Sequence, residues 1–217
     1  MALQIVLASG SPRRKELLER LGFNVKAIPA QIPEERLPDE TAEYYVKRLA
    51  REKVLSVVGR IRTTQYTDGP KRISRVTGKS VDGSLRWVIG ADTVVVSGPQ
   101  VLEKPRDNVE AYDMLLNLAG REHEVITGFC LFDMDREKEG IQAVRTRVRF
   151  KPMTKSEVEK YVSAGESMDK AGAYAIQGVG AYLVEEIEGS YTNVVGLPLC
   201  QVIQMMEEMG AREALPF

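Results

Sequence analysis

A short apolar run that leads directly into a helix start constrains this chain more than any other feature. Residues 5–8 are apolar and predict a first strand, which ends in a turn of two serines and a glycine. Pro12 then stands where the first residue of a helix is expected, with Ser11 as its N-cap. A strand that turns sharply into a helix leaves backbone N–H groups and the positive end of the helix dipole facing outward.

The same turn carries side chains that attract anions. Ser9 and Ser11 supply hydroxyl groups, and Arg13 and Arg14 supply guanidinium groups. Because a helix N-terminus is already suited to anions, these side chains favour a phosphate site there. The local sequence leaves one alternative open, which is an ordinary capped helix with surface arginines.

The bulk composition limits the class of protein. The 217 residues are 43% hydrophobic and 28% charged, which allows one large domain or two small lobes around a shared sheet. A net charge of −1 disfavours a nucleic-acid-binding protein, so any anion site must be local.

No stretch approaches the roughly 20 apolar residues of a membrane span, and no signal-peptide pattern is present, so we expect a cytoplasmic protein. Cys130 and Cys200 stand far apart in apolar contexts and predict two buried free thiols.

Alternating strand and helix patterns predict an α/β fold with a mixed sheet flanked by helices. Strands are expected at residues 5–8, 23–30, 87–96, 101–102, 122–134 and 141–151, and helices at 12–21, 41–58, 107–118, 154–164 and 197–209. Residues 171–188 form a glycine-punctuated strand region in this interpretation. Residues 60–86 lack apolar periodicity and are expected to form a long loop with seven Lys or Arg against two Asp, either solvated or in contact with a polyanion.

Asp92 is the most informative carboxylate. It lies between two apolar runs, residues 88–91 and 93–96, so it is expected within or at the end of a buried strand. An ionised carboxylate there is costly unless a cation compensates it. Two interpretations remain open: a buried capping residue, or a carboxylate that holds a divalent ion or takes a proton from water.

Three lysines and one glutamine are further candidates. Lys53 is expected at the end of the 41–58 helix and Lys104 just past a hairpin turn, and each alone is typical of a surface residue. In the segment 169–178, small residues and glycines flank Lys170 and Gln177, so the backbone there can approach a ligand closely. A glutamine amide both donates and accepts hydrogen bonds, which suits the edge of a nucleobase.

Six co-linear blocks resemble the Maf family of nucleoside triphosphate pyrophosphatases, and most closely its dTTP/UTP pyrophosphatase branch. The blocks are Ser-Gly-Ser-Pro-Arg-Arg at 9–14, Leu-Ala-Arg-Glu-Lys at 49–53, Gly-Ala-Asp-Thr at 90–93, Glu-Lys-Pro at 103–105, the segment 169–178, and Gly-Ser-Tyr with Val-Gly-Leu-Pro within 189–198. The resemblance implies one Maf/ITPase-like domain over residues 1–210, with two lobes around a central active-site cleft and a tail at 211–217. It also implies hydrolysis of dTTP and UTP to the monophosphate and pyrophosphate.

The resemblance further implies roles for individual residues. Asp92 matches the catalytic acid-base residue, and with Glu34 it would hold a divalent cation, Mg²⁺ or Mn²⁺. Pro33 departs from the family, since many relatives carry a second acid beside Glu34. The remaining matched residues would face the triphosphate (Lys53, the catalytic Lys104 and Lys170), hold phosphate (Ser9, Ser11 and Arg14) or set substrate choice (Arg13, Thr93 and Gln177).

A different class of function stays open beside the enzyme. Maf proteins are linked to inhibition of septum formation, so a regulator that senses nucleotides or binds nucleic acid without catalysis is the alternative. The basic loop and the alternating basic residues of 145–151 could serve such contacts, or the latter could be a homodimer rim or a solvated face. The presence of Asp92, Glu34 and Lys104 together argues for the enzyme. The single histidine, His123, is expected to make a structural hydrogen bond.

Overall fold

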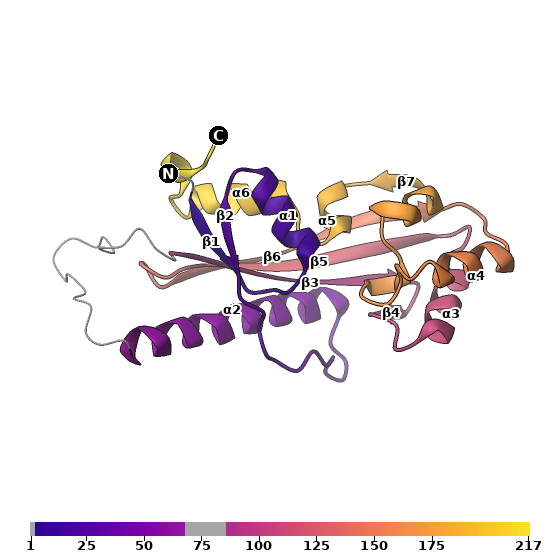
Figure 1. Ribbon diagram of the computed structural model, residues 1–217, viewed down its shortest axis with the longest axis horizontal. Helices are drawn as coiled ribbons and strands as arrows, with labels where there is room; N and C mark the ends of the chain where they lie inside the picture. The colour runs from indigo at the N-terminus through magenta and orange to yellow at the C-terminus, as the bar shows by residue number, and fades with distance from the viewer. Residues whose placement is uncertain (1–2, 68–85) are drawn as a thin grey trace.

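The residues that the structure describes form one mixed sheet of seven strands. Figure 1 shows the computed structural model, which describes residues 3–67 and 86–217. The strand order is β2-β1-β3-β5-β6-β7, and β4 pairs with the end of β3. β1 is parallel to β2 and β3, and the other pairs are antiparallel. The strands are β1 (Gln4–Leu7), β2 (Asn24–Ala27), β3 (Trp87–Ser97), β4 (Gln100–Leu102), β5 (Glu122–Asp133), β6 (Lys138–Phe150) and β7 (Val184–Glu188).

Helices cover both faces of this sheet, as the sequence predicts. The long helix α2 crosses one face, and α1, α5 and α6 lie on the other (Figure 1). α3 and α4 pack against each other at the end of the sheet that also carries β4 and β7. The helices are α1 (Pro12–Arg20), α2 (Ala42–Thr67), α3 (Asn108–Leu118), α4 (Lys155–Ser163), α5 (Tyr191–Val195) and α6 (Leu199–Glu208), with 3₁₀ turns η1 (Ala171–Ala173), η2 (Gly178–Leu183) and η3 (Arg212–Ala214).

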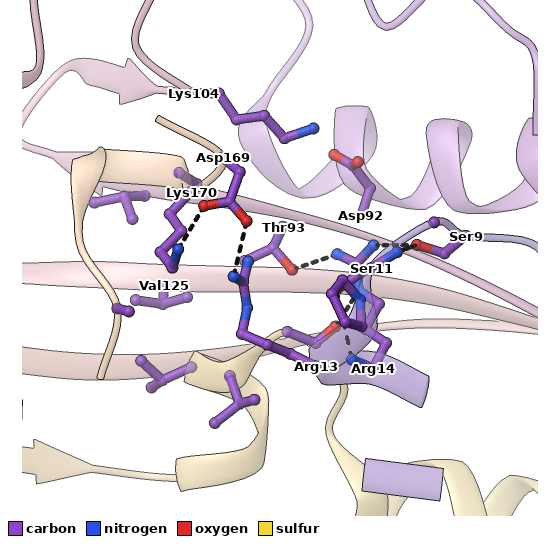
Figure 2. Close-up of a pocket in the computed structure, with 18 of the residues that line it drawn as sticks. Ser9, Ser11, Arg13, Arg14, Asp92, Thr93, Lys104, Val125, Asp169 and Lys170 are labelled. Atoms are coloured by element: carbon purple, nitrogen blue, oxygen red, sulfur yellow. Dashed lines mark hydrogen bonds and ion pairs between the residues drawn. The ribbon is translucent and has the colours of Figure 1, made fainter. Parts of the chain in front are cut away.

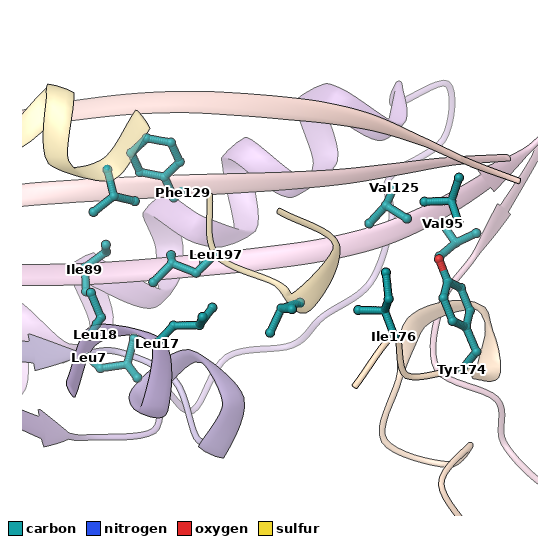
Figure 3. Packing of buried hydrophobic residues seen from close by; sticks show 14 of the residues in the cluster. Leu7, Leu17, Leu18, Ile89, Val95, Val125, Phe129, Tyr174, Ile176 and Leu197 are labelled. Carbon is teal, nitrogen blue, oxygen red and sulfur yellow. The ribbon is translucent and has the colours of Figure 1, made fainter. Parts of the chain in front are cut away.

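The alternation of side chains along β1 divides the core into separate clusters. Ile5 and Leu7 point to the face covered by α1 and α6, where the largest cluster lies (Figure 3). Val6 and Ala8 point to the opposite face and pack with the apolar side of α2. The first strand is therefore buried on both faces, which accounts for its continuous apolar run.

Two glycines allow α2 to lie unusually close to the sheet. A Cβ at Gly90 would be 2.7 Å from the carbonyl oxygen of Ala50, and a Cβ at Gly128 would be 2.5 Å from that of Val46. Gly128 is the cross-strand partner of Asp92. The close approach of α2 thus occurs on both sides of the buried carboxylate.

The structure corrects several predicted elements. α2 continues to Thr67, so the predicted loop at 60–86 is wrong for residues 60–67, and its remainder, 68–85, lies outside the described residues. Val57, Val58 and Ile61 extend the apolar side of this helix past Gly59, which explains its greater length. The predicted strand region 171–188 is strand only from residue 184, because η1 and η2 precede it.

Smaller differences concern α5, the cysteines and the C-terminus. The sequence did not predict the short helix α5, which Ser190 caps. Cys130 is buried as expected, whereas Cys200 is exposed on the outer side of α6. Residues 212–214 of the predicted tail form a 3₁₀ turn. Over residues 3–67 and 86–217, no helix is both long and apolar enough to cross a membrane.

Candidate active site

A cavity of about 450 Å³ opens where β1 ends and α1 begins, above the middle of β3 (Figure 2). Two of its walls come from segments that are far apart in the sequence, residues 9–14 and residues 168–177. The cavity is lined by every residue predicted for the site: Ser9, Ser11, Arg13, Arg14, Glu34, Lys53, Asp92, Thr93, Lys104, Lys170 and Gln177.

The turn after β1 presents the N-terminus of α1 to this cavity. Ser11 is the N-cap, and its hydroxyl accepts a hydrogen bond from the backbone N–H of Arg14 at 3.5 Å. The hydroxyl of Ser9 accepts the N–H of Ser11 at 3.2 Å. Pro12 stands at the first helical position, as predicted. The first helix therefore begins at the cavity wall with its dipole favouring an anion.

Arg14 ties three parts of the fold together beneath that turn. Its guanidinium donates to the carbonyl of Gly196 at 2.7 Å, to the hydroxyl of Thr93 at 3.0 Å and to that of Ser9 at 3.2 Å. Burial lowers the pKa of Arg14. A guanidinium has five N–H donors, so two remain for a ligand in the cavity.

Hydrogen bonding fixes the orientation of the Thr93 hydroxyl. Thr127 has a single hydroxyl proton and donates it to the carbonyl of Asn193 at 3.0 Å. The contact of 2.9 Å between the hydroxyls of Thr93 and Thr127 must then have Thr93 as its donor. With its proton committed and Arg14 donating to it, Thr93 offers the cavity only a lone pair.

Lys53 lies between two carboxylates. Its Nζ is 2.6 Å from Oδ1 of Asp92 and 2.8 Å from Oε1 of Glu34, and the lysine is buried. The expectation that Lys53 ends its helix is wrong, because it stands in the middle of α2. The approach of α2 at Gly90, two residues before Asp92 on the same strand, brings the lysine within reach.

Glu34 is held ionised beside this lysine. Burial by itself would raise its pKa, but the charges of Lys53, Lys104 and Arg14 hold the pKa below its usual value. Lys104 is largely exposed, and its Nζ is 3.8 Å from Oε2 of Glu34. The hydroxyl of Tyr45 donates to the carbonyl of Glu34 at 3.0 Å and fixes the loop that carries it. Tyr45 was not predicted, because in the sequence it reads only as an apolar helix residue.

The opposite wall carries a second group of charges. Arg13 reaches across the cavity to Asp169, 3.1 Å away, and Lys170 contacts the same carboxylate (Figure 2). Although burial opposes it, Lys170 and Arg13 keep the pKa of Asp169 below its usual value. The side-chain amide of Gln177 makes no hydrogen bond to any residue in the described ranges, so it remains available to a ligand.

Comparison with known proteins identifies the family. The family model described as Maf-like protein matches residues 4–209. The chain belongs to the Maf family. A protein of Geobacter sulfurreducens named dTTP/UTP pyrophosphatase is 45% identical over 208 residues, which cover 96% of this chain and 97% of that protein. One of Syntrophotalea carbinolica with the same name is 45% identical over 95% of this chain and 85% of that protein.

The histidine of this Maf protein lies behind the cavity wall rather than in it. His123 is buried, and its Nε2 is 2.9 Å from the hydroxyl of Tyr174, a residue that lines the cavity. Its ring also packs edge-on against Phe150. Burial lowers the pKa of His123 to about 4, so the ring is neutral near pH 7. This agrees with the predicted structural hydrogen bond.

Two carboxylates of the Maf cavity have the chemistry to hold a hard divalent cation. Among the residues that the structure describes, no three His, Cys, Asp or Glu side chains converge as a closed metal cage. Asp92 and Glu34 nevertheless place one oxygen each within 2.8 Å of the same Lys53 nitrogen. Mg²⁺ is commonly held by one or two carboxylates, completed by substrate phosphates and water. The two carboxylates fit that arrangement.

Proposed function

We propose that this Maf protein hydrolyses dTTP and UTP to the nucleoside monophosphate and pyrophosphate. The observation that carries the proposal is the contact of the buried Lys53 with the buried Asp92 and with the more exposed Glu34, in the same cavity as the N-terminus of α1. A carboxylate that can activate water thus stands beside groups that attract phosphate. The names of the relatives support pyrimidine triphosphates as substrates.

In this proposal the cavity binds the triphosphate through charge. A nucleoside triphosphate carries about four negative charges, which charge-assisted hydrogen bonds can offset. Ser9, Ser11, Arg14 and the start of α1 would meet the phosphates on one wall, and Lys170 would meet them on the other. The flexible, exposed Lys104 would follow the charge that develops on the leaving pyrophosphate.

We assign the carboxylates Asp92 and Glu34 to a divalent cation, Mg²⁺ or Mn²⁺. When bound, such an ion neutralises phosphate charge and makes the α-phosphorus easier to attack. Oδ1 of Asp92 accepts from Lys53, while Oδ2 makes no hydrogen bond within residues 3–67 and 86–217. Oδ2 is therefore the atom we assign to orient the water and accept its proton, and Lys53 keeps the carboxylate in place.

Base selection would use Thr93 and Gln177, with Arg13 fixing the nucleotide. Uracil and thymine present an N–H donor between two carbonyl acceptors, whereas cytosine presents an acceptor beside an amino group. Placed against position 3 of the base, the accept-only hydroxyl of Thr93 would take the N–H of uracil or thymine but would be repelled by the bare nitrogen of cytosine, while the Gln177 amide would donate to a neighbouring carbonyl. This supports dTTP and UTP, and modified uracil nucleotides such as pseudo-UTP, over CTP.

The alternative, a non-catalytic regulator that binds nucleic acid, has less support. The arginines of β6 are paired with glutamates: Arg145 with Glu124 at 2.8 Å, Arg149 with Glu186 at 2.5 Å, and Arg147 with Glu188. A polyanion would have to displace these partners. We therefore propose that this face is solvated, and that the enzyme works in the cytoplasm, where nucleoside triphosphates are made. A homodimer remains a prediction.

A nucleotide panel tests the proposal. Purified protein with Mg²⁺ or Mn²⁺ should release pyrophosphate from UTP and dTTP, more slowly from CTP, and not after removal of the ion with a chelator. Single-stranded RNA, offered in the same buffer, should not bind. Absence of pyrophosphate from every nucleotide, together with binding of RNA or of intact nucleotide, would favour the regulator.

A further inference from the structure

The backbone around Gln177 is fixed on both sides by two side chains from one neighbouring segment. Upstream, the N–H of Ala175 donates to the hydroxyl of Tyr161, on α4, at 3.1 Å. Downstream, the N–H groups of Val179 and Gly180 donate to the two oxygens of Glu166, at 3.1 and 3.2 Å. These contacts reach the residues two positions before Gln177 and two and three positions after it.

Tyr161 and Glu166 act as one unit, because the phenol bridges them. The hydroxyl of Tyr161 is 3.4 Å from Oε2 of Glu166, and since it accepts the Ala175 N–H it is free to donate to the carboxylate. Burial raises the pKa of Tyr161 to about 12, so the phenol keeps its proton at neutral pH. A single chain of hydrogen bonds therefore spans the segment from residue 175 to residue 180.

Two glycines make this close approach possible. Gly178 has φ +82°, and a Cβ there would lie 2.5 Å from Oε1 of Glu166. A Cβ at Gly180 would lie 2.6 Å from the hydroxyl of Tyr161. Both glycines face the carboxylate–phenol pair, which gives their places in the Gln-Gly-Val-Gly sequence a physical reason.

The apolar neighbours of Gln177 complete the support. Ile176 and Tyr174 are buried in the largest core cluster, near Val95 and Val125 (Figure 3). Gln177 itself is left with an unpaired amide on the cavity wall. A side chain whose amide has no hydrogen-bond partner among the described residues needs a rigid backbone if it is to meet a base in one orientation.

We propose that Glu166, through Tyr161 and the backbone of residues 175–180, is a positioning residue for base selection by Gln177. The proposal rests on the proposed function, since it assumes that Gln177 meets the base. Glu166 does not line the cavity, so its effect must pass through the segment that it holds. An amide at position 166 would place an N–H against the backbone donors and loosen that segment.

The test compares UTP with CTP in wild type, Glu166→Gln and Tyr161→Phe. We expect the ratio of kcat/KM for UTP over CTP to fall about tenfold in Glu166→Gln, mainly through KM for UTP, with kcat within about threefold. Tyr161→Phe should move the ratio in the same direction by less. Glu159→Gln, an exposed carboxylate on α4, is the charge-matched control and should leave the ratio unchanged.

Other outcomes separate this proposal from the proposed function. An unchanged ratio in a folded Glu166→Gln protein, or an equal loss for both nucleotides, would overturn the positioning role. If Glu166→Gln does not fold, Tyr161→Phe decides by the same criterion. If wild type releases no pyrophosphate, the proposed function fails, and calorimetric binding of UTP and CTP replaces the rates. Wild type that then binds both equally well contradicts the positioning role too.

Discussion

The Nζ of Lys53 lies 2.6 Å from Oδ1 of Asp92, and both side chains are buried. The lysine comes from the middle of α2 and the aspartate from the middle of β3, so the contact joins the helix to the central strand. Burying either charge alone would be costly. The pair therefore explains how a carboxylate can stand buried in a strand that is mostly apolar.

Replacing Lys53 by methionine should destabilise the fold most at neutral pH. Removing one partner of a buried pair leaves an uncompensated carboxylate, so we expect a loss of about 3 kcal/mol in unfolding free energy at pH 7. Lys53 also helps to hold the pKa of Glu34 below its usual value of 4.5. That contribution is present above pH 4.5 and is lost as pH falls, so the deficit should shrink in acid.

Denaturant unfolding at pH 7 and pH 4 measures this difference. Lys47→Met is the control, because Lys47 lies on the same helix in an exposed pair with Glu43 and should cost less than about 1 kcal/mol. A deficit for Lys53→Met that is equal at the two pH values would argue against the charge explanation.

Gly90→Ala should separate α2 from the sheet. The added Cβ would meet the Ala50 carbonyl at 2.7 Å, and such overpacking costs about 1–3 kcal/mol. Since Lys53 stands on the displaced turn, pyrophosphate release should fall as well. Gly59→Ala, in the same helix, has the opposite expected sign. A Cβ there would meet nothing within 4 Å among the described residues beyond its own turn of the helix, so the substitution should stabilise by about 0.5–1 kcal/mol. Thermal unfolding of both variants is decisive, and a stable, active Gly90→Ala protein would refute the close-approach argument.

Arg14→Lys should weaken both the fold and nucleotide binding. A lysine ammonium cannot reproduce the three separate hydrogen bonds to Gly196, Thr93 and Ser9. We expect a loss of about 2 kcal/mol in stability and a rise of about tenfold in KM for UTP. Arg20→Lys, at the exposed end of α1, should change neither quantity. Steady-state kinetics with a normal KM for Arg14→Lys would remove Arg14 from the phosphate site.

His123 should make the protein sensitive to mild acid. Its pKa is about 4 in the fold against 6.5 as the ordinary value, so only the unfolded chain takes up a proton between these values. The contribution of His123 to the free energy of unfolding is therefore fully present above pH 6.5. It falls by about 3 kcal/mol as the pH drops to 4. His123→Leu loses the hydrogen bond to Tyr174 but should show a shallower decline over that range. The measurement is the free energy of unfolding of wild type and His123→Leu between pH 4 and pH 7. Parallel curves for the two proteins would show that His123 does not titrate as described.

The sequence predicted the fold class and the wall of the cavity because both depend on local patterns. The N-cap and proline around Ser11 determine where α1 begins, and the apolar run beside Asp92 places that residue in a buried strand. The family resemblance supplied Glu34, whose loop has no periodic pattern.

What the sequence did not predict depends on contacts between distant segments. The partnership of Lys53 with Asp92 requires the packing of α2 at Gly90, which neither segment shows by itself. Tyr45 and Glu166 each act through a hydrogen bond to a backbone group that is at least 11 positions away in the sequence. The 3₁₀ turns η1 and η2 each contain a glycine with positive φ, Gly172 and Gly178, and a linear pattern does not reveal the distant contacts around these glycines.

The most direct test of the central claim is pyrophosphate release from UTP by wild type and Asp92→Asn, with UTP binding measured on the same samples. The substitution keeps the size of the side chain but removes the basic oxygen assigned to the water. We predict rapid release by wild type with Mg²⁺ and a loss of at least about a hundredfold in Asp92→Asn, which still binds UTP. Near-normal release by Asp92→Asn would contradict the account.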